Sequence, residues 1–361
     1  MSNLELPSST DLRAYFAEAM DAFFRAAART PVVTRDLAVA GTAVRLHVAG
    51  AAMLPAATRA LSHLETTTPP DGPRLDVYAW DGASAGVAMP RPTWPIDAYR
   101  ERGEIQTIDD AGFRAAATAA GPILELWDRE THRAMVWVRD DAALRWYDRS
   151  APCLRIFSWW LSDRGRQMVH GAAVGIDGRA VLLAGRGGSG KSNAAMGSLG
   201  AGLDYLGDDY AVIEPGDEPT VHGLYNTGKV HARDLPRLPF LDGLVANASR
   251  FDTDKAMFFF DDRFRSQVRA KAALRAVVLP ELDLRQPTRL RRASPGAALR
   301  ALSMTTIGQL PHAGGEVFRR LATVARQRPA FHLHVGHDAV VRVPLLLRRL
   351  AAGDMDAGVD D

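Results

Sequence analysis

The hydrophobic positions of the chain follow two different periods in its first 150 residues. Residues 8–29 place apolar side chains at helical spacing, with Ser9 or Thr10 able to cap, which predicts an amphipathic packing helix. The apolar positions of that helix are Leu12, Phe16, Met20, Phe23 and Phe24. Residues 31–150 alternate apolar and polar positions between Pro- and Gly-rich turns, as in strands. We therefore expect an N-terminal α+β domain, mostly β, over residues 1–150.

The pattern changes at residue 151, where apolar strand runs begin to alternate with helices. This alternation is typical of α/β layer folds. A helix is predicted over 154–169, followed by a Gly-separated strand pair over 171–185 and a further strand over 272–282. We expect a second domain over residues 151–352 and a short acidic tail over 353–361.

Composition and charge narrow the classes of function. Among 361 residues, 44 are Lys or Arg and 42 are Asp or Glu, so the net charge of +2 provides no bulk field for nucleic acid. The lone cysteine, Cys153, excludes an internal disulfide and a Cys-based zinc site, and it is expected to be a small buried hydrophobe. Neither a secretory signal nor an apolar run of about 18 residues is visible. These features predict a cytoplasmic protein without membrane partners.

The most informative segment matches the Walker A pattern G-x-x-x-x-G-K-S. It follows an apolar strand and precedes a helix, as a phosphate-binding loop requires. The expected nucleotide-binding residues are Gly185, Arg186, Gly187, Gly188, Ser189, Gly190, Lys191, Ser192 and Asn193. Glycines let backbone N–H groups point at phosphate oxygens, and the helix N-terminus adds positive charge. We expect ATP and Mg²⁺ as cofactors, with Lys191 reaching the β- and γ-phosphates and Ser192 ligating the metal; another phosphate donor stays open.

Two further features are spaced so as to meet this loop. Asp208 and Asp209 follow an apolar segment 17 residues after Lys191, at the expected end of a neighbouring strand. One carboxylate can take a proton from an attacking hydroxyl while the other holds a metal or a water, and spacing alone does not say which. His170 lies 21 residues before Lys191, and a strand hairpin would return its imidazole to the phosphates.

The order of these elements resembles a known family. The chain contains HG-x-x-V-x-x-x-G, then G-x-x-G-S-G-K-S, then G-x-x-Y-L-x-D-D-Y. Over residues 150–350 this is similar to the HPr kinase/phosphorylase family, and more closely to HPr-kinase-like serine kinases, some of which modify lasso peptides. The resemblance implies a P-loop kinase fold related to phosphoenolpyruvate carboxykinase, Asp208 as catalytic base and a homo-oligomeric assembly. Asp209 would then support a metal or a water.

Other parts of the family pattern differ in this chain. Asn193 stands where the HPr enzymes usually carry an acidic residue, and their later Glu-, Arg- and Gly-rich signature is not visible. These departures argue against HPr as the substrate and against phosphorylase activity. The segment from Tyr225 to Lys229 resembles the Tyr-x-x-x-Lys segment of the kinase-like branch. Lys229 is either a second phosphate or substrate cation or a solvent-exposed lysine in a turn.

The main hypothesis is an ATP- and Mg²⁺-dependent kinase that phosphorylates a hydroxyl, with Ser or Thr of a peptide or small protein as the favoured acceptor. Lys191 and His170 would neutralise charge, Asp208 would accept the hydroxyl proton, and the N-terminal domain would recognise substrate. Two alternatives stay open. One is a kinase for a small molecule such as a sugar, nucleoside or antibiotic, and the other is a nucleotide-sensing protein that transfers nothing.

Several side chains are weighed and given ordinary structural roles. Trp159 and Trp160 are expected in the core. A helix start is predicted over 261–269, with Arg263 or Arg265 facing either solvent or an anionic ligand. The C-terminal helices carry an arginine stripe, either a solvated face or a docking surface for an acidic partner, at Arg319, Arg320, Arg326, Arg348 and Arg349. A surface strand, rather than a metal site, is expected at His332, His334 and His337.

Overall fold

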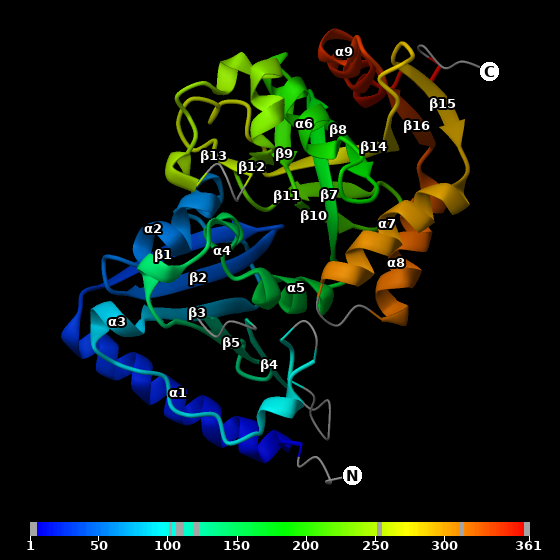
Figure 1. Ribbon diagram of the computed structural model, residues 1–361. Coiled ribbons are helices and arrows are strands. Elements are labelled where there is room, and N and C mark those ends of the chain that lie inside the picture. The colour runs from blue at the N-terminus through cyan, green and yellow to red at the C-terminus, as the bar shows by residue number, and fades with distance from the viewer. Residues whose placement is uncertain are drawn as a thin grey trace. The chain divides into compact units, whose positions relative to one another are not determined.

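The computed structural model describes residues 6–100, 103–105, 112–118, 123–250, 255–310 and 314–356. It is a mixed α/β protein that divides into two compact units, Met1–Trp160 and Leu161–Asp361, each with its own mixed sheet (Figure 1). Within the described ranges, no helix combines the length and the apolar character needed to cross a membrane. The last five residues of the predicted acidic tail, 357–361, lie outside the described residues.

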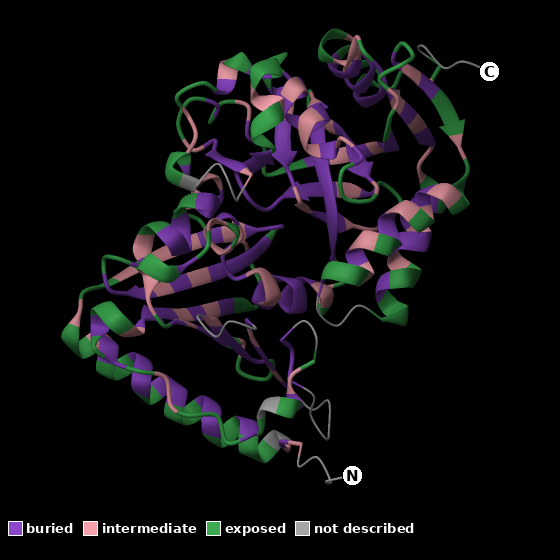
Figure 2. Ribbon diagram, in the orientation of Figure 1, coloured by how far each residue is buried: buried purple, intermediate pink, exposed green. Residues whose placement is uncertain are grey.

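The N-terminal unit packs one long helix on a sheet. Helix α1 (Ser9–Arg29) is capped by Ser8, whose hydroxyl accepts from the Asp11 N–H while the Asp11 carboxylate accepts from Ser8, so the cap precedes the two residues that the sequence suggested. Its buried and exposed faces alternate visibly in Figure 2. The sheet has the order β1-β2-β3-β6-β5-β4, in which β2, β3 and β6 are parallel. Its strands are β1 (Val32–Val39), β2 (Thr42–Ala49), β3 (Arg74–Asp81), β4 (Phe113–Ala117), β5 (Ile123–Asp128) and β6 (Arg133–Val138).

Short helices surround this sheet, and Trp159 and Trp160 are buried at the C-terminal end of the unit. The helices are α2 (Leu54–Thr58), α3 (Gly82–Ala85), α4 (Trp146–Ser150) and α5 (Leu154–Ser162). Trp159 and Trp160 are 2% and 0% exposed, which confirms them as core residues. Cys153 is also buried and is a free thiol, as expected.

The C-terminal unit contains the larger sheet, with the order β11-β10-β7-β8-β14-β16-β15 and with β9 beside β7. Strand β14 is parallel to β8 and β16, while the hairpin β7–β8 is antiparallel. Strand β11 also pairs with β14, so β14, β8, β7, β10 and β11 form a closed ring of pairings. Its strands are β7 (Gln167–Ile176), β8 (Arg179–Ala184), β9 (Asp204–Gly207), β10 (Tyr210–Glu214), β11 (Thr220–Gly223), β14 (Lys271–Leu282), β15 (Arg289–Ala293) and β16 (Ala330–Val335).

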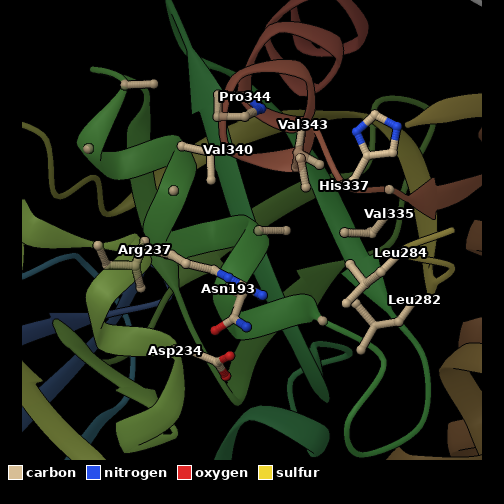
Figure 3. A pocket seen from close by; sticks show the side chains of 18 of the residues that line it. Asn193, Asp234, Arg237, Leu282, Leu284, Val335, His337, Val340, Val343 and Pro344 are labelled. Atoms are coloured by element: carbon tan, nitrogen blue, oxygen red, sulfur yellow. The ribbon is translucent and has the colours of Figure 1, made fainter. Parts of the chain in front are cut away.

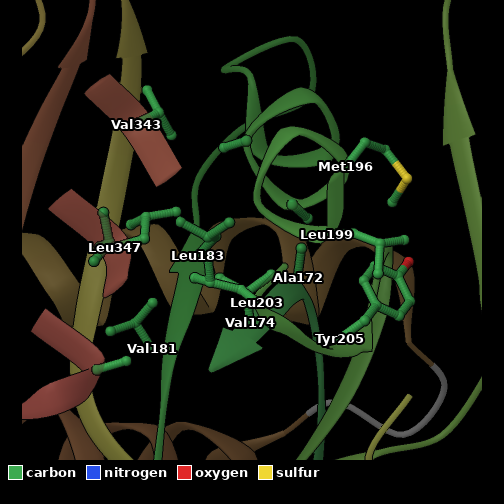
Figure 4. Close-up of a cluster of buried hydrophobic side chains, with 14 of the residues drawn as sticks. Ala172, Val174, Val181, Leu183, Met196, Leu199, Leu203, Tyr205, Val343 and Leu347 are labelled. Atoms are coloured by element: carbon green, nitrogen blue, oxygen red, sulfur yellow. The ribbon is translucent and has the colours of Figure 1, made fainter. Parts of the chain in front are cut away.

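Both faces of this sheet are apolar, because alternate side chains of β7 and β8 enter two different cores. Val181 and Leu183 pack with α6 (Lys191–Gly200) and α9 (Ala339–Ala352), as Figure 4 shows. Leu182 enters the opposite core, beneath α7 (Pro295–Gln309) and α8 (Gly315–Gln327). Strands covered on both faces read as continuous apolar runs, which explains the VLL run before the glycine loop.

The small hairpin β12 (Thr227–Val230) and β13 (Ala256–Phe259) lies beside α6. Close packing is visible at Gly228, where an added Cβ would come within 2.6 Å of the Met196 Cε on α6. The hairpin thereby holds the segment containing Lys229 against the start of α6.

The structure corrects two predicted helices. The helix predicted over 154–169 ends at Ser162, because the chain turns at Gly165, whose φ of +73° is left-handed, and β7 begins at Gln167. Residues 261–269 form turns rather than a helix start. The predicted arginine stripe is partly neutralised locally, since Arg319 and Arg320 pair with Glu316 and Arg349 pairs with Asp354.

Candidate active site

The glycine loop joins the end of β8 to the start of α6, as the Walker A pattern predicts. Gly188 and Gly190 have φ values of +77° and +100°, a region that side chains with a Cβ rarely adopt. A Cβ added at Gly187 or Gly188 would meet no heavy atom within 4 Å, so no other part of the described chain packs on these two positions. We call the turn over residues 185–190 the cradle.

Lys191 lies within this cradle and is only 6% exposed. Its Nζ donates to the carbonyl oxygens of Gly185 and Arg186, at 2.7 and 3.0 Å. Burial lowers the pKa of Lys191, and the charges of Asp208 and Asp209 oppose that shift. The Ser189 Oγ is also buried, and among the described residues it has no hydrogen-bond partner. A cation and an orphaned hydroxyl in the cradle suit an anionic ligand.

Asp208 follows β9 directly and is 4% exposed. One carboxylate oxygen accepts from the Ser192 hydroxyl at 2.9 Å, and the other accepts from the backbone N–H of Lys229 at 3.2 Å. Burial and the neighbouring charge of Asp209 raise the pKa of Asp208 to about 6, although these hydrogen bonds and the Lys229 charge oppose the rise. Asp208 and Asp209, the two carboxylates singled out from the sequence, therefore both lie beside the phosphate loop.

The pKa of Asp209 is shifted in the opposite direction to that of Asp208. Burial alone would raise the pKa of Asp209, but the Lys229 ammonium, 2.6 Å from its Oδ2, holds that pKa below its ordinary value. The backbone of Asp209 has a φ of +66°, which Asp tolerates better than most residues. Lys229 is 3% exposed, which overturns the alternative of a solvent-exposed lysine. We call Asp208, Asp209 and Lys229 the buried cluster.

His170 lies on β7 opposite Tyr210, next to the buried cluster. Its Nε2 is 3.9 Å from Asp209 Oδ1, and its buried Nδ1 has no partner in the described part of the chain. Burial and the Lys191 charge lower the pKa of His170 to about 4, against the pull of Asp209. The imidazole is therefore neutral near pH 7. The hairpin expected from the sequence does return His170 to the loop region.

The sequence analysis missed Lys255, which stands just before β13. Its charge acts on three groups of the site, because it contributes to lowering the pKa of His170, Lys191 and Asp209. No local motif surrounds Lys255, so only the fold reveals it. Three lysines and two aspartates converge here, which leaves an excess of positive charge for an anion.

Other sequence candidates lie elsewhere. The guanidinium of Arg263 lies over the ring of Phe264, at 5.6 Å from its centroid. His332 and His334 lie on β16 and face Glu281 of the adjacent strand. Throughout the described ranges, no group of three or more His, Cys, Asp or Glu side chains is placed to hold a metal. Asn193 lines a cavity beside Gly190.

The residues present nevertheless fit a Mg²⁺-nucleotide. Mg²⁺ is commonly held by only one or two protein groups, with phosphates and water completing its octahedron. Ser192 and Asp209 would supply those groups, and Ser192 is hydrogen-bonded to Asp208, the residue before Asp209. The cradle, Lys191 and the free N–H groups at the start of α6 supply the phosphate contacts.

Comparison with known proteins gives little beyond this geometry. No protein-family model matches the chain, and no curated protein matches it. Among solved structures, the Hpr(Ser) kinase/phosphatase from Coxiella burnetii matches with a TM-score of 0.29 and 13% identity, over 52% of this chain and 94% of that one. This is a distant likeness, and the chemistry of the site has to be judged from its own side chains.

Proposed function

We propose that the C-terminal unit is a P-loop phosphotransferase of the HPr-kinase-like type, which moves the γ-phosphoryl group of ATP to a hydroxyl. The observation that carries the proposal is the 2.9 Å hydrogen bond between Ser192 of the loop and Asp208. It joins a phosphate-binding element to a buried carboxylate whose pKa of about 6 suits proton acceptance near neutral pH. A protein that only senses nucleotide has no need of such a base.

Each side chain then has a definable part. The loop N–H groups and Lys191 bind and orient the triphosphate, and Lys191 with Lys229 offsets negative charge during transfer. Asp208 accepts the proton of the attacking hydroxyl at its carboxylate. Asp209 stays ionised because Lys229 holds it so, and with Ser192 it would hold Mg²⁺. Bound Mg²⁺ supplies charge neutralisation on the phosphates. Neutral His170 can donate or accept a hydrogen bond beside Asp209.

The proposed acceptor is a Ser or Thr hydroxyl of a peptide or small protein. The test is transfer from Mg-ATP to a Ser/Thr peptide array, run beside a panel of sugars, nucleosides and aminoglycosides. We expect a mass gain of one phosphate on peptides. Asp208→Asn should lower the transfer rate by about 10²–10⁴-fold, the usual contribution of a general base, while Mg-ATP affinity stays within about threefold.

The controls separate binding from chemistry. Lys191→Ala should lose Mg-ATP binding in calorimetry, and Glu218→Gln, an exposed residue in the turn between β10 and β11, should match the wild type. If a folded Asp208→Asn protein transferred phosphate at the wild-type rate, Asp208 would not be the general base. Mg-ATP binding without transfer to any hydroxyl would favour a nucleotide sensor. Transfer to the small molecules alone would show that the acceptor is a small molecule rather than a peptide.

A further inference from the structure

A cavity of about 490 Å³ opens beside Gly190, at the end of the phosphate loop where α6 begins (Figure 3). This volume falls in the range of roughly 300–1,000 Å³ that is typical of small-molecule sites. One wall is a stripe of α6 formed by Asn193, Gly197 and Gly200, which lie one helical turn apart. The other walls come from the 3-10 helices Ala232–Arg237 and Pro239–Leu241, from the end of β14, and from the segment 335–344.

The cavity is continuous with the phosphate loop, because Gly190 belongs to both. Lys191 and the neighbouring Ser192–Asp208 pair mark the end of the loop where the β- and γ-phosphates are expected. Backbone N–H groups of a Walker A loop hold the preceding phosphates, and the N–H of Asn193 is among those left free at the start of α6. A triphosphate held in this direction presents its α-phosphate at Asn193, where the cavity begins.

The apolar side of the cavity is unusually exposed to water. Leu282 and Leu284 are 54% and 49% exposed, and Val340 is 61% exposed. A flat ring whose face lies against them would remove this surface from water, which is favourable at roughly 25 cal/mol per Å². A purine base is such a group.

The polar side of the cavity carries a small set of suitable groups. Asn193, Asp234 and Arg237 lie to the left of the view in Figure 3, and Leu282, Leu284 and His337 lie to the right. An asparagine amide both donates and accepts, so it can pair with adjacent polar atoms of adenine. An aspartate is a common partner of ribose hydroxyls. Arg237 carries a planar guanidinium that can stack on a base.

From these features we infer that the cavity binds the nucleoside of the phosphate donor, with the base against Leu282 and Leu284 and with Asn193 selecting adenine. The inference rests on the phosphotransferase function proposed above. The inference assigns a binding site to the nucleoside, which is the part of the donor that can be selected. The phosphate loop alone binds any polyphosphate.

Gly197 allows the cavity to be filled without disturbing the fold. It lies within α6 and lines the cavity, and a Cβ there would meet no heavy atom within 4 Å. Leucine is also a better helix former than glycine. Gly197→Leu should therefore fold while occupying the nucleoside space. Gly308→Leu is the matched control, because Gly308 is an exposed glycine of α7 with equally open surroundings.

The experiment compares Mg-ATP with Mg-tripolyphosphate by calorimetry. We expect the wild type and Gly308→Leu to bind Mg-ATP at least about tenfold more tightly than Mg-tripolyphosphate. Gly197→Leu should lose this difference through weaker Mg-ATP binding, with its Mg-tripolyphosphate affinity unchanged within twofold. Asn193→Ala should narrow the preference for Mg-ATP over Mg-GTP at unchanged Mg-tripolyphosphate affinity.

Failure of the nucleoside assignment and failure of the phosphotransferase proposal would give different results. Equal wild-type affinity for the two ligands, or unchanged Mg-ATP binding by Gly197→Leu, would overturn the nucleoside assignment and leave the phosphate loop intact. If Gly197→Leu impaired peptide phosphorylation at saturating Mg-ATP but bound Mg-ATP normally, the cavity would belong to the acceptor and the assignment would again be overturned. Binding of neither ligand to the wild type would overturn the phosphotransferase proposal together with this one.

Discussion

Two groups of titratable side chains in the C-terminal unit each bring histidine close to a carboxylate, but in different surroundings. The buried cluster of Asp208, Asp209 and Lys229 lies beside His170, and Asp208 is 4% exposed. We call His332, His334 and Glu281 the surface cluster. Both histidines contact the Glu281 carboxylate, and the Glu281 side chain is 55% exposed. The buried group has strongly displaced protonation equilibria: the pKa of Asp208 rises to about 6 and that of His170 falls to about 4.

Burial is the largest cause of the pKa shifts of Asp208 and His170. Water screens a charge pair at the surface, whereas burial removes the solvation of each charge and makes every neighbour count. A cluster whose members are pushed in opposite directions is a frequent feature of active sites. Three measurements test this contrast between the buried cluster and the surface cluster.

The largest expected effect comes from removing the cation of the buried cluster. Lys229→Met keeps much of the side-chain volume but leaves the Asp209 carboxylate without its 2.6 Å partner. Loss of one member of a buried ion pair typically destabilises by about 3–5 kcal/mol, and we expect about 3 kcal/mol here because Asp209 retains some solvent contact. Urea unfolding at pH 7 measures it.

The double variant Lys229→Met/Asp209→Asn serves as the control for this pair. It should recover most of the lost stability, because the uncompensated charge is gone. If the double variant is as unstable as Lys229→Met, the loss reflects packing of the lysine stem rather than charge.

The second effect is a pH dependence of stability from Asp208. Its pKa of about 6 in the folded protein exceeds the ordinary value of 3.8, so the folded state binds the proton more tightly than the unfolded state. Stability contributed by this group therefore falls as pH rises from about 4 to about 6 and stays low above that. Relative to wild type, Asp208→Asn should be more stable at pH 8 than at pH 4 by about 2 kcal/mol.

Urea unfolding of both proteins across pH 4–8 measures this difference, and titrations of other groups largely cancel between them. A variant-minus-wild-type difference that is flat with pH would mean that Asp208 titrates normally. It would also remove the physical reason for choosing Asp208 as the proton acceptor.

The smallest effect is expected in the surface cluster. Glu281→Gln removes the charge that His332 and His334 face, but the glutamate is well solvated. Exposed ion pairs contribute little, so the change in unfolding free energy should stay below about 0.5 kcal/mol between pH 5 and pH 8. A larger, pH-dependent loss would erase the contrast between the two clusters.

The local part of the site could be predicted from the sequence. The Walker A segment joins β8 to α6 through a loop, because the glycine pattern and the flanking apolar runs are contiguous in the chain. The β7–β8 hairpin that returns His170 was also predictable, since two apolar runs flank a Gly-containing turn. The predicted helix over 154–169 was wrong beyond Ser162, because helical spacing of apolar residues does not register the turn at Gly165.

The rest depends on contacts between distant segments. The ion pair of Lys229 with Asp209 spans 20 residues, and its burial depends on how β12 packs against α6. Lys255 carries no motif at all. The cavity beside Asn193 is built from separate stretches of the unit, and no periodic pattern links Gly197 with Leu284 or His337.

The closed ring of pairings in the larger sheet has a consequence for the behaviour of the protein at high concentration. Because β11 pairs with β14, the strand order runs outward from this ring to β15, which ends it. Unpaired strand edges are templates for intermolecular strand addition, and charged side chains discourage it. Strand β15 reads RLRRA and carries Arg289, Arg291 and Arg292. Arg292 pairs with Asp356, and the remaining arginine charge along this edge opposes the addition of a strand from another molecule in a crowded solution.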